Sequence, residues 1–169
     1  YFLYFMPMAV ICIDVNPSLE LTVNQLEQVI SVKGYNEDGE QLANSAEIQF
    51  LHYTQAVEQL LSSGEMEQYL QGDSVVSIGV IGDNHQKDQQ ILGVLQSCTA
   101  NHQNAYCYLA SKNEVAEAHS LGLSYGKYRA FLQLQSIDPT ITPEQVAQMT
   151  MAEIHSLMEA LSGQTNGFC

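Results

Sequence analysis

The chain has 169 residues, 46 % of them hydrophobic, so it can fold as one globular domain with a real core. It carries 19 acidic and 5 basic residues, a formal charge of −14. That balance argues against nucleic acid and anionic membrane surfaces as partners, because both are bound through basic patches. The cysteines show neither CxxC nor Cys/His ligand spacing, so we predict no metal and no cofactor, expect free thiols and leave a disulfide open.

The first ten residues are apolar and aromatic. They are too few to span a bilayer, which takes about 20 residues, and they lack the basic start of a signal peptide. Two interpretations stay open for this segment. It is either an ordinary leading strand or the interfacial end of a membrane helix that precedes Tyr1.

Residues 11–24 alternate strictly, with apolar side chains at odd positions and, from Asp14 on, polar ones at even positions. This period of two predicts one long strand with a buried face and a wet face. Asn16 and Pro17 interrupt it without changing its phase. Proline cannot donate to a sheet ladder and belongs at edges or bulges, so one interpretation is a harmless kink.

The Asn16-Pro17 bond also permits a specific reaction. The asparagine carboxamide nitrogen can attack its own main-chain carbonyl, close a succinimide and expel the proline nitrogen. Holding the reacting atoms in place supplies up to ~7–11 kcal/mol of such a barrier. Proline blocks the competing attack by the following backbone N–H, because it has none.

The rest of the chain alternates strands and helices. A turn at 25–28 leads to a strand at 29–35, whose pairing places residues 34–37 opposite the Asn16-Pro17 bond. Residues 36–39 are predicted as a turn. The elements expected after it are a helix from 44 to 63, a central strand at 74–81, a helix at 84–100, a strand at 105–110, and helices at 111–121, 125–135, 143 onward and 150 onward.

Residues 14–20, reading D-V-N-P-S-L-E, resemble a strand in the extracytoplasmic domain of RsgI-type anti-sigma factors. Residues 122–128, reading G-L-S-Y-G-K-Y, are similar to a later segment of that family, with Tyr125 where many relatives have proline. The similarity is dense over about 8–42 and looser over about 121–140. Between them only the order of elements matches.

The resemblance implies self-cleavage at the Asn16-Pro17 bond, with the N-terminal fragment staying bound to the rest. It also implies a single-pass protein of the cell membrane, with this domain on the extracytoplasmic side and a membrane helix before Tyr1. A cytoplasmic segment outside this chain would bind a SigI-like sigma factor, and a sensor region would follow Cys169. Separation of the fragments would expose a stub to an intramembrane protease.

The predicted fold is α+β, a two-layer sandwich. A mostly antiparallel four-stranded sheet begins with the long split strand and a hairpin, and helices cover one face while the polar even face stays open or lightly covered. The predicted organisation is a membrane-proximal segment at 1–10, one domain at 11–162 and a tail at 163–169. Within that domain, the sheet part ends at about 121 and a helical extension covers 122–162.

The leading functional hypothesis is a self-cleaving signalling domain. Asn16 is the nucleophile and scissile residue, and Pro17 is the leaving group. Asp14 and Ser18 flank Asn16 on one strand face, where they can orient the amide or protonate the leaving nitrogen. The alternative is a non-cleaving extracellular adhesion or spacer module. An enzyme acting on external substrates has little support, because no Ser/His/Asp or metal spacing stands out.

Overall fold

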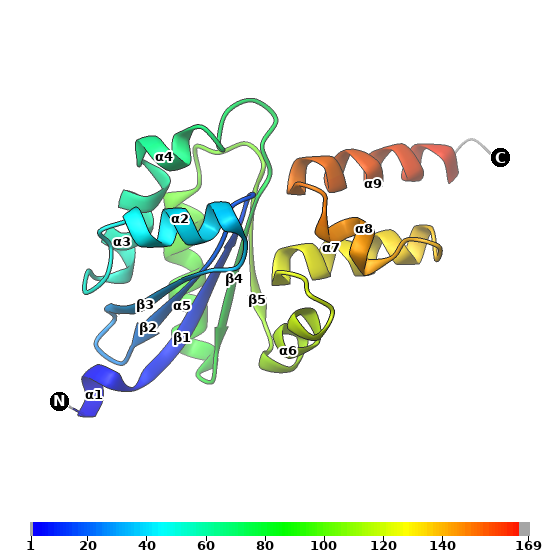
Figure 1. Cartoon of the computed structure of the whole chain (residues 1–169). Coiled ribbons are helices and arrows are strands. Elements are labelled where there is room, and N and C mark those ends of the chain that lie inside the picture. The colour runs from blue at the N-terminus through cyan, green and yellow to red at the C-terminus, as the bar shows by residue number, and fades with distance from the viewer. Residues whose placement is uncertain (1, 166–169) are drawn as a thin grey trace.

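The computed structural model describes residues 2–165, with side chains to residue 163. Within this range five strands form one mixed sheet in the order β3-β2-β1-β4-β5, with helices on both faces (Figure 1). The elements are α1 (Phe2–Phe5), β1 (Pro7–Asp14), β2 (Ser18–Asn24), β3 (Val29–Gly34), α2 (Glu37–Ser45), α3 (Tyr53–Leu61), α4 (Gly64–Glu67), β4 (Val76–Gly82), α5 (His85–Cys98), β5 (Ala105–Ala110), α6 (Lys112–Ser120), α7 (Tyr125–Ile137), α8 (Pro143–Ala147) and α9 (Met151–Thr165).

The predicted long split strand is a hairpin, which corrects the first element of the predicted sheet. β1 and β2 are antiparallel, and Asp14 lies opposite Ser18. The connection at 15–17 has an odd number of residues, so odd positions of β1 face odd positions of β2, as in the Ile11–Leu21 pair. The period of two therefore continues through the turn, and the pattern cannot distinguish a hairpin from one long strand.

β2 and β3 form the hairpin that was predicted. Leu21 lies opposite Val32. The register shifts after Thr22, so that Val23 pairs with Val29. This irregularity makes Val29 the fully buried residue at the start of β3, while its neighbour Ile30 is half-buried.

The α+β class is confirmed, but the sheet has five strands within residues 2–165 and is mixed. β4 pairs antiparallel with β1, and β5 pairs parallel with β4 after the crossover helix α5. The fifth strand arises because the stretch predicted as one long strand forms two strands, β1 and β2. It also makes β1 the central strand, flanked by β2 and β4.

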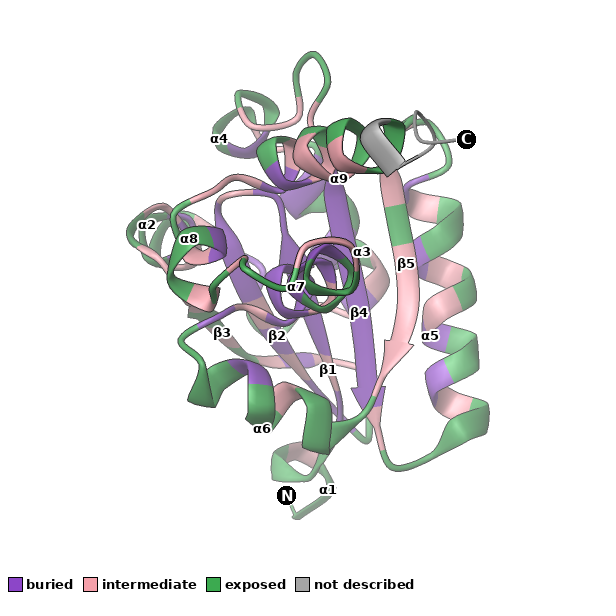
Figure 2. Cartoon of the chain, turned by 90° about the vertical axis from the view of Figure 1, so that its right-hand side faces the viewer, coloured by how far each residue is buried: buried purple, intermediate pink, exposed green. Residues whose placement is uncertain are grey.

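Helices cover both faces of the sheet, so the expected two-layer sandwich is a three-layer fold (Figures 1 and 2). The odd face, with Ile11 and Ile13 fully buried, packs on α2 to α5. The even face, with Cys12, packs on α6 to α9 through residues such as Leu123 and Phe131. The helical extension thus forms a second helical layer over the face that was expected to stay open or lightly covered.

Regular elements extend into both predicted terminal segments, 1–10 and 163–169. β1 begins at Pro7, and α9 extends to Thr165. Tyr1 and Cys169 lie outside the described residues. Cys12, Cys98 and Cys107 are free thiols. Among the helices of the described part, none has the length and apolar character needed to cross a membrane.

Candidate functional site

The Asn16-Pro17 bond lies at the tip of the β1–β2 hairpin. The Val15 N–H donates to the Pro17 carbonyl at 3.0 Å, which closes the tight turn, and both of these residues are buried. Asn16 is half-buried and has a φ of +119°. Such a conformation costs about 1–3 kcal/mol in a residue other than glycine. The backbone strain is therefore located at the residue whose carbonyl would be attacked.

Asn36 holds the Asn16 side chain. Its Oδ1 accepts hydrogen bonds from the Gly39 N–H at 2.8 Å and the Ser18 N–H at 3.2 Å. Its Nδ2 therefore faces the other way and donates to Asn16 Oδ1 at 3.1 Å. The two backbone donors fix the orientation of both amides. Within the described residues no group accepts a hydrogen bond from Asn16 Nδ2, so this nitrogen can turn toward its own carbonyl.

The β3–α2 connection places Asn36 next to the tip, as the predicted position of residues 34–37 requires. Its tight packing depends on glycines. A Cβ on Gly39 would lie 2.2 Å from the Ser18 carbonyl oxygen, and one on Gly34 would lie 2.1 Å from the Glu40 nitrogen. The sequence pattern did not point to a role for Asn36, because residues 36–39 were predicted as a turn. Asn36 is the N-cap of α2, and its signal was an asparagine followed by acidic residues.

Asp14 ends β1 and is 2 % exposed. Its Oδ2 accepts a hydrogen bond from the Gly126 N–H at 2.8 Å, at the start of α7. A Cβ on Gly126 would lie 2.6 Å from this oxygen, so the contact requires glycine there. No described residue hydrogen-bonds to Oδ1. Residues 122–128, far from the hairpin in sequence, therefore pack against its end.

Burial raises the pKa of Asp14, which favours the protonated carboxyl group. The nearby Ser124 and Ser18 hydroxyls, the Gly126 N–H and the Lys127 charge oppose that rise. Burial lowers the pKa of Lys127, and Asp14 opposes this. Lys127 Nζ donates to the Ala147 carbonyl at 3.0 Å. The site thus contains a buried carboxyl group whose proton is held more tightly than usual.

A cavity of about 260 Å³ lies beside the tip, lined by Ser18, Asn36, Ser124 and Lys127, among others. Tyr35 and His119 form another wall of it. Glu20 connects this pair, because it accepts from Tyr35 Oη at 2.9 Å and contacts His119 Nε2 at 3.1 Å. The histidine ring stacks on the tyrosine ring at 4.9 Å. No sequence motif had singled out His119.

The structure brings all four predicted site residues to one end of the hairpin. Asn16 and Pro17 form its tip, and Asp14 and Ser18 are paired across its base. Both paired residues lie on the even face and are buried. Within the described residues no group of three His, Cys, Asp or Glu side chains is placed to hold a metal ion. The arrangement consists of an oriented carboxamide, a strained peptide and a buried acid.

The family model described as the anti-sigma factor RsgI-like central domain matches residues 8–133. Among curated proteins, the chain is 28 % identical over 160 residues to the anti-sigma-I factor RsgI7 of Acetivibrio thermocellus, covering 89 % of this chain and 29 % of the relative. It is 24 % identical to the anti-sigma-I factor RsgI9 of the same organism, covering 93 % of this chain and 24 % of the relative. The chain thus spans less than a third of the length of these relatives.

Proposed function

The chain belongs to the RsgI family of anti-sigma factors, and from that premise we propose that this domain cleaves its own backbone between Asn16 and Pro17. The observation that carries the proposal is the Asn36–Asn16 contact of 3.1 Å at a residue with a φ of +119°. The contact orients the Asn16 carboxamide, and the backbone conformation strains the peptide bond next to it. No external substrate is required.

In the proposed reaction, Asn16 Nδ2 attacks the main-chain carbonyl carbon of Asn16. A C–N bond forms and closes a succinimide, while the bond to the Pro17 nitrogen breaks. One proton leaves Nδ2 and one reaches the proline nitrogen, so the step is balanced. Positioning lowers its barrier because Asn36 has already restricted the side chain.

We assign the delivery of a proton to Asp14 and the orientation of groups to Ser18. The buried Asp14 carboxyl has a raised pKa, so it retains a proton at a pH where an exposed aspartate has lost its own. Ser18 follows the leaving residue, and its N–H is bonded to Asn36. Ser18 therefore couples the position of the segment that begins at Pro17 to the position of the Asn36 and Asn16 side-chain amides.

The fragments are proposed to stay together because the N-terminal piece is the central strand of the sheet. β1 pairs with β2 on one side and with β4 on the other. Ile11 and Ile13 are fully buried and Val15 is 6 % exposed. At about 25 cal/mol per Å² of apolar surface, three such side chains contribute several kcal/mol to holding the piece.

The test is the intact mass of the denatured chain. We expect two fragments, residues 1–16 and 17–169, whereas Asn16→Ala gives one mass because alanine has no nucleophile. The stability of the variant should lie within about 1 kcal/mol of the parent, since this side chain is outside the core. A single uncut mass of the parent after prolonged incubation would support the non-cleaving adhesion or spacer module.

For the whole protein we propose the signalling arrangement of the family. A membrane helix precedes this extracytoplasmic domain, a cytoplasmic segment binds a sigma factor, and an intramembrane protease acts once the fragments separate. Family membership supports this proposal. The test is to express the full-length protein with a tag at each end and to fractionate the cells. An N-terminal tag in the soluble fraction of cells that have received no stimulus would contradict the membrane anchor.

A further inference from the structure

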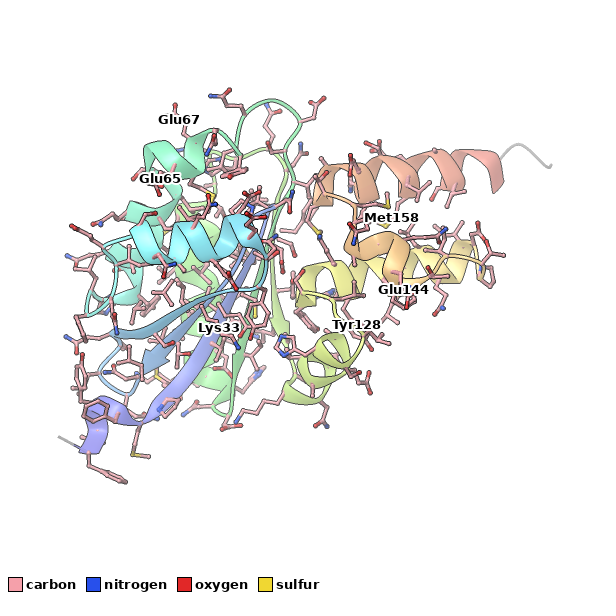
Figure 3. The ribbon with its side chains drawn as sticks, viewed as in Figure 1. Lys33, Glu65, Glu67, Tyr128, Glu144 and Met158 are labelled. Atoms are coloured by element: carbon pink, nitrogen blue, oxygen red, sulfur yellow. The ribbon has the colours of Figure 1, made fainter. Side chains whose placement is uncertain are left out.

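A second cavity, of about 410 Å³, lies between the sheet and the helices α7 and α9. Its apolar walls include Tyr106 and Tyr108 of β5, and Met151 and Met158 of α9. Met158 lies on the side of α9 that faces α7 (Figure 3). The volume falls in the range of small-molecule sites, about 300–1,000 Å³. Asn16, Pro17, Asp14, Ser18 and Asn36 do not line this groove, whereas Gly126, whose N–H donates to Asp14, does.

Arg129, the only arginine of the chain, lines the same groove. Its Cζ lies 4.0 Å from the centroid of the Tyr108 ring. Within the described residues no carboxylate forms an ion pair with its guanidinium and no group accepts a hydrogen bond from it. In contrast, Lys87 and Lys112 each contact a carboxylate. A guanidinium keeps its charge and has five N–H donors, so the groove holds a fixed positive charge with unused donors.

The groove also contains a polar pair. Tyr108 Oη and Ser77 Oγ are 2.8 Å apart, and both residues line the cavity. Burial raises the pKa of Tyr108, so this group remains a neutral hydroxyl. An apolar cavity with a few convergent polar groups is the usual composition of a ligand site.

We propose that this groove binds a small carboxylate with an apolar body. The carboxylate pairs with the Arg129 guanidinium, and the body packs against Tyr108, Met151 and Met158. The planar fork of arginine matches the two oxygens of a carboxylate, which makes such pairs bidentate. The proposed binding requires no cleavage, although Gly126, which contacts Asp14, lies in the wall of the groove.

Charge and geometry favour a monoanion over other ligands. Arg129 already lies over the Tyr108 ring, so a cationic ligand would compete with the guanidinium for that ring. Among the described residues that line the groove, Arg129 is the one permanent cation, whereas a phosphate monoester carries close to two negative charges. Glu159 also lines the groove, but its side chain is 74 % exposed and contacts His155 at 3.5 Å. Solvent and this contact therefore weaken its repulsion of a bound carboxylate.

The experiment is a calorimetric titration of the 169-residue chain with 3-phenylpropionate and with its neutral amide. We expect saturable binding of the carboxylate and at least about tenfold weaker binding of the amide, because a hydrogen-bonded charge is lost. Arg129→Gln should weaken carboxylate binding by the same factor. The matched control Lys112→Gln removes a cation outside the groove and should leave the affinity within about twofold.

Arg129→Lys keeps the charge without the fork, so its affinity should fall between those of the parent and Arg129→Gln. Thermal unfolding of each variant shows that it is folded. Absence of saturable 3-phenylpropionate binding to the parent chain would overturn the proposal. Equal affinity of the parent and a folded Arg129→Gln for the carboxylate would also overturn it.

Discussion

Replacing Asn36 with aspartate separates the positioning of the nucleophile from the folding of the site. Aspartate keeps an oxygen acceptor for the Gly39 and Ser18 N–H groups, so α2 retains its N-cap. It loses the Nδ2 donor that holds Asn16 Oδ1 at 3.1 Å. A carboxylate oxygen would then face the Asn16 oxygen. We therefore expect Asn36→Asp to fold normally and to cleave slowly.

The size of this effect follows from one lost hydrogen bond and from the freedom it restores to Asn16. A neutral hydrogen bond contributes about 0.5–1.5 kcal/mol, and 1.36 kcal/mol corresponds to about tenfold in rate. Misplacing a reacting group by about 1 Å can cost about a hundredfold. The cleavage rate should therefore fall by about ten- to a hundredfold, while the free energy of unfolding should fall by no more than the ~0.5–1.5 kcal/mol of that hydrogen bond.

The rate is measured as the loss of uncut chain after cell-free synthesis, followed by intact mass. Asn44→Asp is the matched control, since Asn44 is an exposed residue of the same helix. Asn36→Ala loses the cap as well and should be destabilised by about 1 kcal/mol. If Asn36→Asp cleaves at the parent rate while folded, Asn36 does not position the nucleophile and the reasoning fails.

Four further expectations follow from the same geometry. In the uncut Asn16→Ala background, the raised pKa of Asp14 means that the folded state binds the proton more tightly than the unfolded state. The stabilising contribution of Asp14, measured against Asp14→Asn, is therefore fully present below the unfolded-state pKa of about 3.9 and is lost as pH rises through the folded-state pKa. Urea unfolding across pH measures it, and a pH-independent difference between the two proteins would contradict the prediction. Gly126→Ala should slow cleavage, because its Cβ would meet Asp14 Oδ2 at 2.6 Å, and an unchanged rate by intact mass would argue against a role for this contact. The cut fragments should co-elute in native size exclusion, since β1 is paired on both sides; prompt loss of the N-terminal piece would refute this. Under force applied at the two ends, the cut chain should separate along β1 before its helices unfold, and equal rupture forces for cut and uncut chains in a single-molecule experiment would disprove it.

Local patterns in the sequence were sufficient for much of the site. The alternation over residues 11–24 placed Ile11, Ile13 and Leu21 on one buried face, because strand geometry has a period of two. The dipeptide Asn16-Pro17 stood out as an interruption without a change of phase. The pairing of β2 with β3 then located residues 34–37 near it, since register follows from the same alternation.

Only the tertiary structure decided what surrounds these residues. An odd connection preserves parity, so the sequence could not show that Asn16 lies at a hairpin tip instead of within a strand. Burial of the even face depends on α7, whose Gly126 contacts Asp14 across 112 positions of the chain. The polar residues of that face resembled a wet surface because alternation reports side-chain polarity, whereas their burial comes from long-range packing that a local pattern does not encode.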